Sequence, residues 1–345
     1  MRDDDLLTSD AQTTGGRRAL RWTFLGLAVL VVAAAALSVL MGRYPGPLLS
    51  SPSAILDDDL ATSLVLRLRL PRVAAALLLG AVLSVAGLVF QMLFRNPLVD
   101  SGFLGVSQGA AFGASLAIVF AAGSATTVQL GAALFAFLGL AASYGLAHRI
   151  RFGGSVLRLV LAGIAVGSLF TSGTGILKYL ADPQRQLPDI TFWMLGGLWS
   201  ITWRDLLEML PVTVPALAVM LLLRWRLNLL ALREETAFSL GAAPRRERLL
   251  LLVAAAAATA AVVAKAGQVT WVGLIIPHIA RRLVGSDAQL ALPASLLLGG
   301  LFVLVCDDLA RTVLTGEIPL GILTSFVATV VFLVLMTSHR RGLRG

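Results

Sequence analysis

Side chains that could carry out chemistry are few in this chain, and they do not gather into a catalytic set. His278 follows Pro277, with no second histidine or carboxylate at the spacing of metal ligands. We expect it to bond a neighbouring backbone carbonyl instead. Asp307 and Asp308 precede Arg311, and we expect a helix-end or ion-pair role for them. The sequence therefore predicts no enzyme, no metal site and no cofactor.

Two kinds of residue that couple an energy source to a protein's work are also missing from the sequence. It has no stretch of the form G-x-x-x-x-G-K-[ST], the loop that cradles nucleotide phosphates. It lacks the intramembrane carboxylates with which secondary transporters couple ions. A separate partner must then supply the energy. The first hypothesis is therefore a transporter that a separate protein powers. The alternative is a secondary transporter of a small amphipathic solute, and an intramembrane enzyme is a third, less favoured class.

Apolar residues dominate the whole length of the chain. Of 345 residues, 57% are hydrophobic and 14% are charged, whereas a soluble domain carries about 25% charged residues. The mean hydropathy is +0.86. The apolar runs are about 20 residues long, enough to cross a bilayer, and they do not alternate, so we predict helices rather than barrel strands. The net charge of +9 comes from arginines at the ends of these runs, which argues against a nucleic-acid partner. The fold class is all-α, a polytopic membrane protein.

The charges at the span ends predict the orientation. With both termini cytoplasmic, 19 of the 28 lysines and arginines lie inside, as the positive-inside rule favours. We expect residues 1–21 to form a disordered, polar cytoplasmic tail and residues 22–340 to form the membrane domain, which includes a cytoplasmic loop at 227–248. The ten predicted spans lie near residues 22–42, 71–94, 102–122, 128–148, 156–180, 206–224, 248–266, 271–284, 290–305 and 318–337.

The fifth predicted span carries small residues on one face. Gly163, Gly167, Thr171 and Gly175 recur every four residues, so they lie on the same side of a helix. Such a stripe is typical of close helix packing in membranes. The same face could also border a translocation path, since hydroxyl groups accompany it and no charge does. The candidate path residues are Gly163, Gly167, Ser168, Thr171 and Ser172.

The longest cytoplasmic loop contains two apolar residues where water is expected, Phe238 and Leu240. Glu234 and Glu235 before them and Gly241 behind them predict a short capped helix. The two apolar side chains either tuck beneath the bundle or anchor a partner protein in a groove.

Three arginines lie at the predicted outer face: Arg69, Arg72 and Arg311. They could pair locally with Asp307, with Asp308 or with lipid phosphates. They could also receive carboxylates of a partner protein, because a guanidinium binds a carboxylate through two parallel hydrogen bonds.

Several short motifs follow one another from about residue 60 to the C-terminus. They are Arg69-Leu70-Pro71-Arg72, then Gly80, Gly87 and Gln91, then Asn96-Pro97-Leu98 with Gly105-Val106-Ser107-Gln108-Gly109-Ala110, then Ala237, Leu240 and Gly241, then Trp271 to Arg281 with Pro277-His278, and last Asp307, Arg311 and Glu317-Ile318-Pro319-Leu320-Gly321. In order and spacing these motifs resemble the FecCD-type permeases, the membrane subunits of bacterial ATP-driven importers for ferric siderophores, haem and vitamin B12. Asn96, Pro97, Pro277, His278, Glu317 and Pro319 are the structural members of these motifs.

The resemblance implies a type II importer permease of the inner membrane. Two copies of an ATP-binding subunit would grip the 227–248 loops through Ala237, Phe238, Leu240 and Gly241. A periplasmic or lipoprotein solute-binding protein would dock on the three outer arginines through its glutamates. A second permease subunit, identical or paralogous, would complete the pathway for a bulky metal chelate, with a ferric siderophore as the first candidate.

The chain departs from the family pattern in three places. Val99-Asp100-Ser101 stands where an alanine and a proline are usual, and Cys306 replaces a usual alanine. Residues 327–331 lack the Gly-x-Pro expected before Phe332, so the last helix should bend less. None of these changes removes a residue expected to couple or dock.

Overall fold

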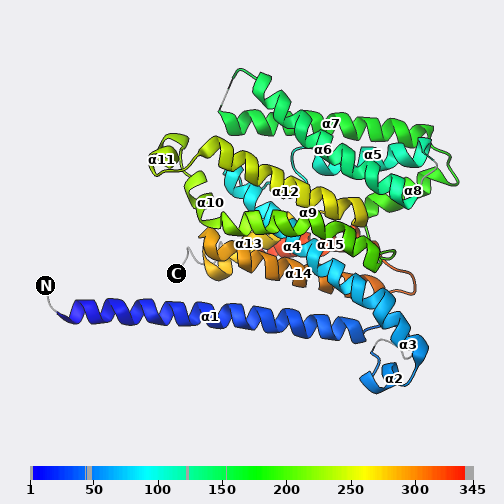
Figure 1. Ribbon diagram of the computed structural model, residues 1–345, viewed down its shortest axis with the longest axis horizontal. Helices are drawn as coiled ribbons and strands as arrows, with labels where there is room; N and C mark the ends of the chain where they lie inside the picture. The colour runs from blue at the N-terminus through cyan, green and yellow to red at the C-terminus, as the bar shows by residue number, and fades with distance from the viewer. Residues whose placement is uncertain (1–2, 43, 45–48, 122–123, 153, 339–345) are drawn as a thin grey trace.

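The computed structural model describes residues 3–42, 44, 49–121, 124–152 and 154–338. Within this range the regular structure is helical, apart from an isolated bridge between Met41 and Leu49, and the predicted all-α class is confirmed. The helices, labelled in Figure 1, are α1 Asp3–Leu40, α2 Pro52–Leu56, α3 Asp59–Leu64, the π-helical turn η1 Val65–Arg69, α4 Leu70–Phe94, α5 Val106–Phe120, α6 Ala125–Arg149, α7 Ser155–Leu180, α8 Gln186–Leu195, α9 Trp203–Leu222, α10 Arg224–Leu230, α11 Glu234–Ser239, α12 Pro244–Ala266, α13 Val272–Val284, α14 Ala288–Thr312 and α15 Leu320–Ser338.

Ten of these helices coincide with the ten predicted spans. Eight in the described part of the chain are long and apolar enough to cross a membrane by themselves: α1, α4 with the turns before it, α6, α7, α9, α12, α14 and α15. The other two, α5 and α13, have 15 and 13 residues and are about 20 Å long at 1.5 Å per residue. Each follows an irregular segment that is buried in the protein. Leu104 is the buried residue before α5, and Val269 is the buried residue before α13. Irregular backbone at membrane depth requires such burial.

The two described ends of the chain lie at the same end of the bundle. Figure 1 places them at the left, the end at which α10 and α11 also lie, whereas α2, α3 and α8 lie at the opposite end. We call these the α11 end and the α8 end. The predicted disorder of residues 1–21 is not found from Asp3 onward, because α1 begins there. Once a helix exists, each further residue adds one hydrogen bond at little cost.

α4 is the central helix, and its glycines set how closely its neighbours approach. A Cβ built on Gly80 would lie 2.0 Å from the Gly299 carbonyl oxygen of α14, and one on Gly87 would lie 2.0 Å from the Gly273 oxygen of α13. Ser84 donates a hydrogen bond of 2.7 Å to the Ser295 carbonyl of α14. Glycine therefore lets the three helix backbones touch, as is common between membrane helices.

α5, α6 and α7 form a second packed group, at the top of Figure 1. α5 meets α6 where Gly113 faces Gly131 backbone to backbone. The rings of Phe112, Phe135 and Phe170, one from each helix, contact one another at centroid distances of 5.1 to 6.1 Å. This group carries one of the candidate sites.

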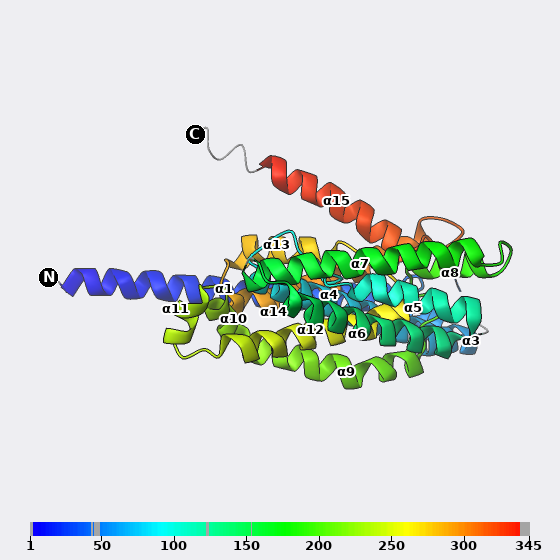
Figure 2. The ribbon, with the colours of Figure 1, turned by 90° about the horizontal axis from the view of Figure 1, so that it is seen from above.

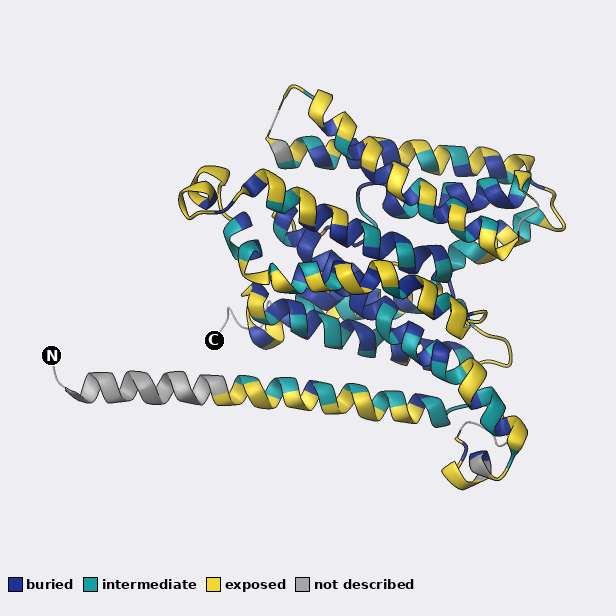
Figure 3. Ribbon diagram, viewed as in Figure 1, coloured by how far each residue is buried: buried dark blue, intermediate teal, exposed yellow. Residues whose placement is uncertain are grey.

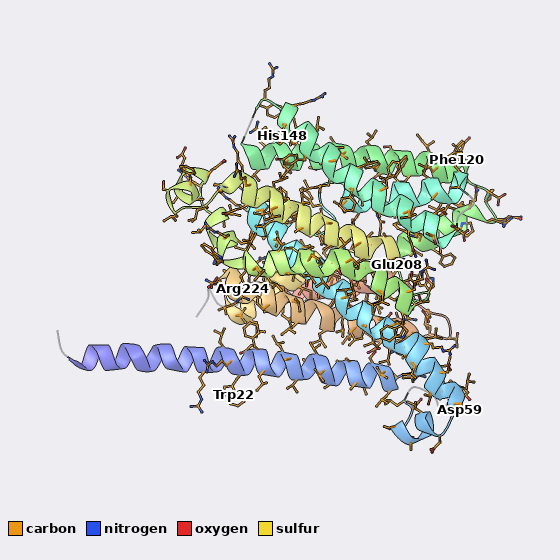
Figure 4. The ribbon with its side chains drawn as sticks, in the orientation of Figure 1. Trp22, Asp59, Phe120, His148, Glu208 and Arg224 are labelled. Atoms are coloured by element: carbon orange, nitrogen blue, oxygen red, sulfur yellow. The ribbon has the colours of Figure 1, made fainter. Side chains whose placement is uncertain are left out.

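α1 and α15 lie at the periphery. α1 runs along the outside of the bundle against α14, and Trp22 points away from the other helices (Figure 4). α15 leaves the bundle at an angle (Figure 2). Figure 3 shows exposed residues along α1, where lipid or another subunit is expected to meet apolar side chains such as Val32 and Leu30.

Candidate functional sites

An open cavity of about 450 Å³ lies against α7 and brings together all five predicted path residues. Gly163 and Gly167 form its floor, and the exposed hydroxyl side chains of Ser168, Thr171 and Ser172 line it. The remaining lining residues are Phe103, Leu104, Gly105, Gln108 and Ile164. None of the lining side chains carries a charge.

The wall opposite α7 is held in an unusual backbone conformation. Leu104 and Gly105 have φ angles of +69° and +75°, a left-handed region that costs a residue with a Cβ more than it costs glycine. Ser143 of α6 donates a hydrogen bond of 2.8 Å to the Leu104 carbonyl, and Gln268 donates one of 3.0 Å to the Ser107 carbonyl. These bonds tie the loop before α5 to α6, and the first turn of α5 to the segment after α12.

The small-residue stripe of α7 packs at only one end. A Cβ on Gly163 would lie 3.1 Å from the Leu104 Cα, whereas one on Gly175 would meet nothing within 4 Å. Thr171 donates its hydroxyl to the Gly167 carbonyl at 2.9 Å, so its oxygen can still accept a bond from a solute. Helix packing therefore accounts for Gly163, whereas Gly167 and Thr171 line the cavity and Gly175 lies outside its lining.

The second candidate site is the α11 segment. Ala237 is fully buried, while Phe238 is 73% exposed and Leu240 is 56% exposed. Gly241 has a φ angle of +78°, and its carbonyl accepts a 2.8 Å hydrogen bond from Arg226. The two apolar side chains thus stand outward on a fixed turn and do not tuck beneath the bundle. A cavity of about 450 Å³ beside Phe238 is lined by Glu234, Glu235, Phe238, Ala243, Pro244, Arg245 and Arg246.

The three predicted outer arginines lie together at the α8 end, and each is engaged within the chain. Arg72 holds Asp307 at 2.9 Å and Glu317 at 2.9 Å. Arg311 holds Asp308 at 2.5 Å and donates to the Met41 carbonyl at 2.8 Å. The expected ion-pair role of the two aspartates is confirmed.

The third arginine, Arg69, bonds the end of α1 and the segment that follows it. Arg69 donates to the carbonyls of Val39 at 3.1 Å and Tyr44 at 2.5 Å. The Tyr44 hydroxyl in turn donates to Asp58 at 2.7 Å, and this bond lowers the pKa of the Asp58 carboxyl. Side chains of Arg72 and Arg311 are only 13% and 10% exposed, so the cluster first of all joins α1, α4 and α14.

The motif residues have structural roles. The Asn96 side chain accepts from the Leu98 N–H at 2.9 Å, a turn that Pro97 supports. His278 Nδ1 lies 2.7 Å from the Leu274 carbonyl, as predicted. The Pro319 carbonyl accepts from the Ile322 N–H at 3.1 Å, where α15 begins. Over the described residues, no group of three histidine, cysteine or acidic side chains could hold a metal.

One polar cluster escaped the sequence reasoning. Lys265, at the α8 end of α12, donates to Asp205 at 2.8 Å, to Glu208 at 2.6 Å and to Gln129 at 2.5 Å, and it is 8% exposed. Figure 4 labels Glu208 on α9. The spacing of Thr202 and Asp205, which form a capping box, was an available signal for the start of α9. No signal in the sequence indicated the partners of Lys265, because these depend on how α9 and α12 pack.

Comparison with known proteins agrees with this architecture. The model of the FecCD transport family matches residues 25–338. The molybdate import system permease of Haemophilus influenzae is 36% identical over 324 residues, covering 92% of this chain and 96% of that protein. The hemin transport system permease of Yersinia pestis is 38% identical over 292 residues, covering 84% and 87%.

A solved structure has the same fold. It is an inward-facing conformation of a metal-chelate type ABC transporter, which superimposes with a TM-score of 0.85 at 36% identity, covering 92% of this chain and 99% of that one. A secondary transporter and an intramembrane enzyme do not agree with these matches. The chain belongs to the FecCD transport family and is the membrane permease subunit, not the catalytic subunit, of an ABC importer.

Proposed function

We propose that this permease moves a bulky metal chelate, with a ferric siderophore as the first candidate, inward across the bacterial inner membrane by alternating access. The observation that carries the proposal is the open, uncharged cavity on α7, lined by Gly163, Gly167, Ser168, Thr171 and Ser172. Hydroxyls and glycine backbone present weak polar contacts, which suit passage better than tight binding. A permanent charge in the cavity would hold an ionic group too firmly.

The α11 end is the cytoplasmic end in this proposal. Exposed arginines gather there, among them Arg149, Arg151, Arg245 and Arg246, as the positive-inside rule requires. Both termini then lie in the cytoplasm. Arg69, Arg72 and Arg311, at the α8 end, then face the outside of the cell membrane.

A second permease subunit, identical or paralogous, closes the cavity. Figure 2 shows α7 and α15 on the side of the molecule opposite to α9. Both helices leave large apolar side chains uncovered on their surfaces, including Leu169 at 70% and Phe326 at 68% exposure. A two-fold pair would cover these side chains and place the two cavities face to face.

Two ATP-binding subunits dock on the pair of permeases, one on the α11 segment of each. The contact is made by Phe238 and Leu240, the exposed apolar pair of side chains on the fixed turn. Such a pair resembles the apolar anchors of helix-in-groove recognition. A solute-binding protein docks at the α8 end, where Glu317 is 41% exposed beside Arg72. The carboxylates of the solute-binding protein would join the existing network of Arg69, Arg72 and Arg311. They would not meet free guanidinium groups, because these arginines are already bonded within the chain.

The test is uptake into proteoliposomes that contain the permease with its ATP-binding and solute-binding partners. Radiolabelled ferric siderophore, haem and molybdate are offered separately, each with its loaded binding protein. We expect ATP-dependent uptake of the ferric chelate. Uptake of molybdate or haem alone would overturn the choice of cargo, and uptake without ATP would overturn the mechanism.

A further inference from the structure

A separate cavity of about 370 Å³ opens at the α11 end, and basic side chains surround it. It lies where the ends of α4, α6, α7 and α12 meet α11. Its polar lining comprises Tyr144, His148, Arg158, Glu234, Arg245 and Arg248. We call it the basic cavity. It has no residue in common with the α7 cavity and shares only Glu234 and Arg245 with the cavity beside Phe238.

Among the described residues, two of its arginines, Arg158 and Arg248, form no ion pair with an acidic side chain, and Glu234 attracts Arg248 only from a longer distance. Arg158 donates one bond to the Ile150 carbonyl at 3.3 Å, and Arg248 donates one to the Leu230 carbonyl at 3.2 Å. The Nε–H groups of both arginines are buried and make no hydrogen bond. A buried donor without a partner destabilises the folded state, and more so when it carries a charge. Two such groups in one cavity indicate a missing acceptor.

The nearby charges do not supply that acceptor. Glu234 is the acidic residue of the lining, and its ion pair, 3.9 Å long, is with Arg245 at the exposed rim. Arg95 adds a further positive charge close to Arg248 and is itself bonded to the Leu232 carbonyl. The cavity therefore has an excess of positive charge and two unused donors, the Nε–H groups of Arg158 and Arg248.

The other walls are apolar. Phe94 of α4, Leu159 of α7 and Leu252 of α12 contribute to them. The volume exceeds that of a single small anion, so a ligand with a charged head and an uncharged remainder fits better. Basic pockets between helices at the cytoplasmic interface are a recognised way of binding lipid head groups.

We propose that the basic cavity binds a phosphate group, held by Arg158 and Arg248, from either an acidic phospholipid or a soluble phosphate compound. A phosphate oxygen accepts hydrogen bonds from guanidinium groups in a planar, paired geometry. One phosphate there would link α7 to α12 next to α11. This proposal does not depend on the nature of the transported solute.

Binding is measured on the whole purified permease in a neutral detergent. In the lipid arm, phosphatidylglycerol or phosphatidylcholine is added, and bound lipid is counted by native mass spectrometry. In the soluble arm, inorganic phosphate or glycerol 3-phosphate is compared with chloride at equal ionic strength by thermal unfolding. The test variant is Arg158→Gln with Arg248→Gln. The matched control is Arg149→Gln with Arg151→Gln, exposed residues at the same end that remove the same charge.

We expect the wild type and the control to bind a phosphate compound, and the test variant to bind it at least tenfold more weakly. Retention of phosphatidylglycerol but not phosphatidylcholine identifies a lipid, and stabilisation by inorganic phosphate identifies a soluble ligand. Without phosphate, the test variant should unfold at no lower temperature than the wild type, because it loses two unsatisfied buried donors. A variant with Arg158→Lys and Arg248→Lys keeps the charge and should retain part of the binding.

Two results would overturn the proposal. One is equal binding by all variants, and the other is no binding of any phosphate compound by the wild type. If, in the second case, the test variant also loses assembly with the ATP-binding subunit, the cavity receives an acidic side chain of that protein instead.

Discussion

Arg72 of α4 and Asp307 of α14 form a buried ion pair in which Nε lies 2.9 Å from one carboxylate oxygen and Nη2 lies 2.9 Å from the other. The Asp307 side chain is 1% exposed. Glu317, between α14 and α15, shares the same guanidinium. One side chain therefore connects the central helix to the start of the last one, at the face where we place the solute-binding protein.

Arg72→Gln should destabilise the permease strongly. It leaves Asp307 buried without its partner, and such a loss costs about 3–5 kcal/mol. Arg72→Gln with Asp307→Asn should recover much of that loss, because no unpaired charge remains. Thermal unfolding in detergent measures both. Arg204→Gln, which breaks an exposed pair with Glu208, serves as a control and should leave the unfolding temperature nearly unchanged. If Arg72→Gln alone unfolds like the control, the pair contributes little.

Phe238→Asp or Leu240→Asp should weaken the complex with the ATP-binding subunit without changing the stability of the permease. Both side chains are exposed here, so the charge is costly only when a partner buries it. Phe152→Asp is the matched control, since Phe152 is 66% exposed outside α11. Co-purification and transport-coupled ATP hydrolysis are the measurements. Full assembly of both α11 variants would exclude this segment from the interface.

The close approach of α4 and α13 gives a third prediction. In Gly87→Ala, the new Cβ would fall 2.0 Å from a backbone oxygen of Gly273, and overpacking of this kind costs about 1–3 kcal/mol or more. The helices must separate, so the unfolding temperature should fall. Gly145→Ala in α6 meets nothing within 4 Å and should be neutral or gain up to about 1 kcal/mol from helix propensity. Equal unfolding temperatures for the two variants would contradict the close packing.

Much of this architecture can be predicted from the sequence, because bilayer thickness fixes the length of apolar runs. The ten helices at the predicted spans, the short helix α11 and the carbonyl partner of His278 follow from local patterns. Charge partners that are far apart in the chain do not. Lys265 and Asp205 meet only when α9 packs on α12. Arg158 and Arg248 come to line one cavity only when the group of α5, α6 and α7 packs against α12. The outer arginines are intermediate, since their grouping was predicted while their depth of burial was left open.

The α7 cavity gives the last prediction, which separates a water-filled path from helix packing. In a Cys306→Ala background, single cysteines at Ser168, Thr171 and Ser172 should react with a membrane-impermeant thiol reagent, because a thiol reacts as its thiolate in contact with water. Thr174→Cys is the matched control on the same helix, since Thr174 is 4% exposed, and it should stay unreactive. In the assembled transporter, the rates at the three cavity positions should change when ATP is bound, as alternating access opens one side and closes the other. If all three positions are protected in every nucleotide state while the assembled transporter is active, α7 serves only to pack against its neighbours.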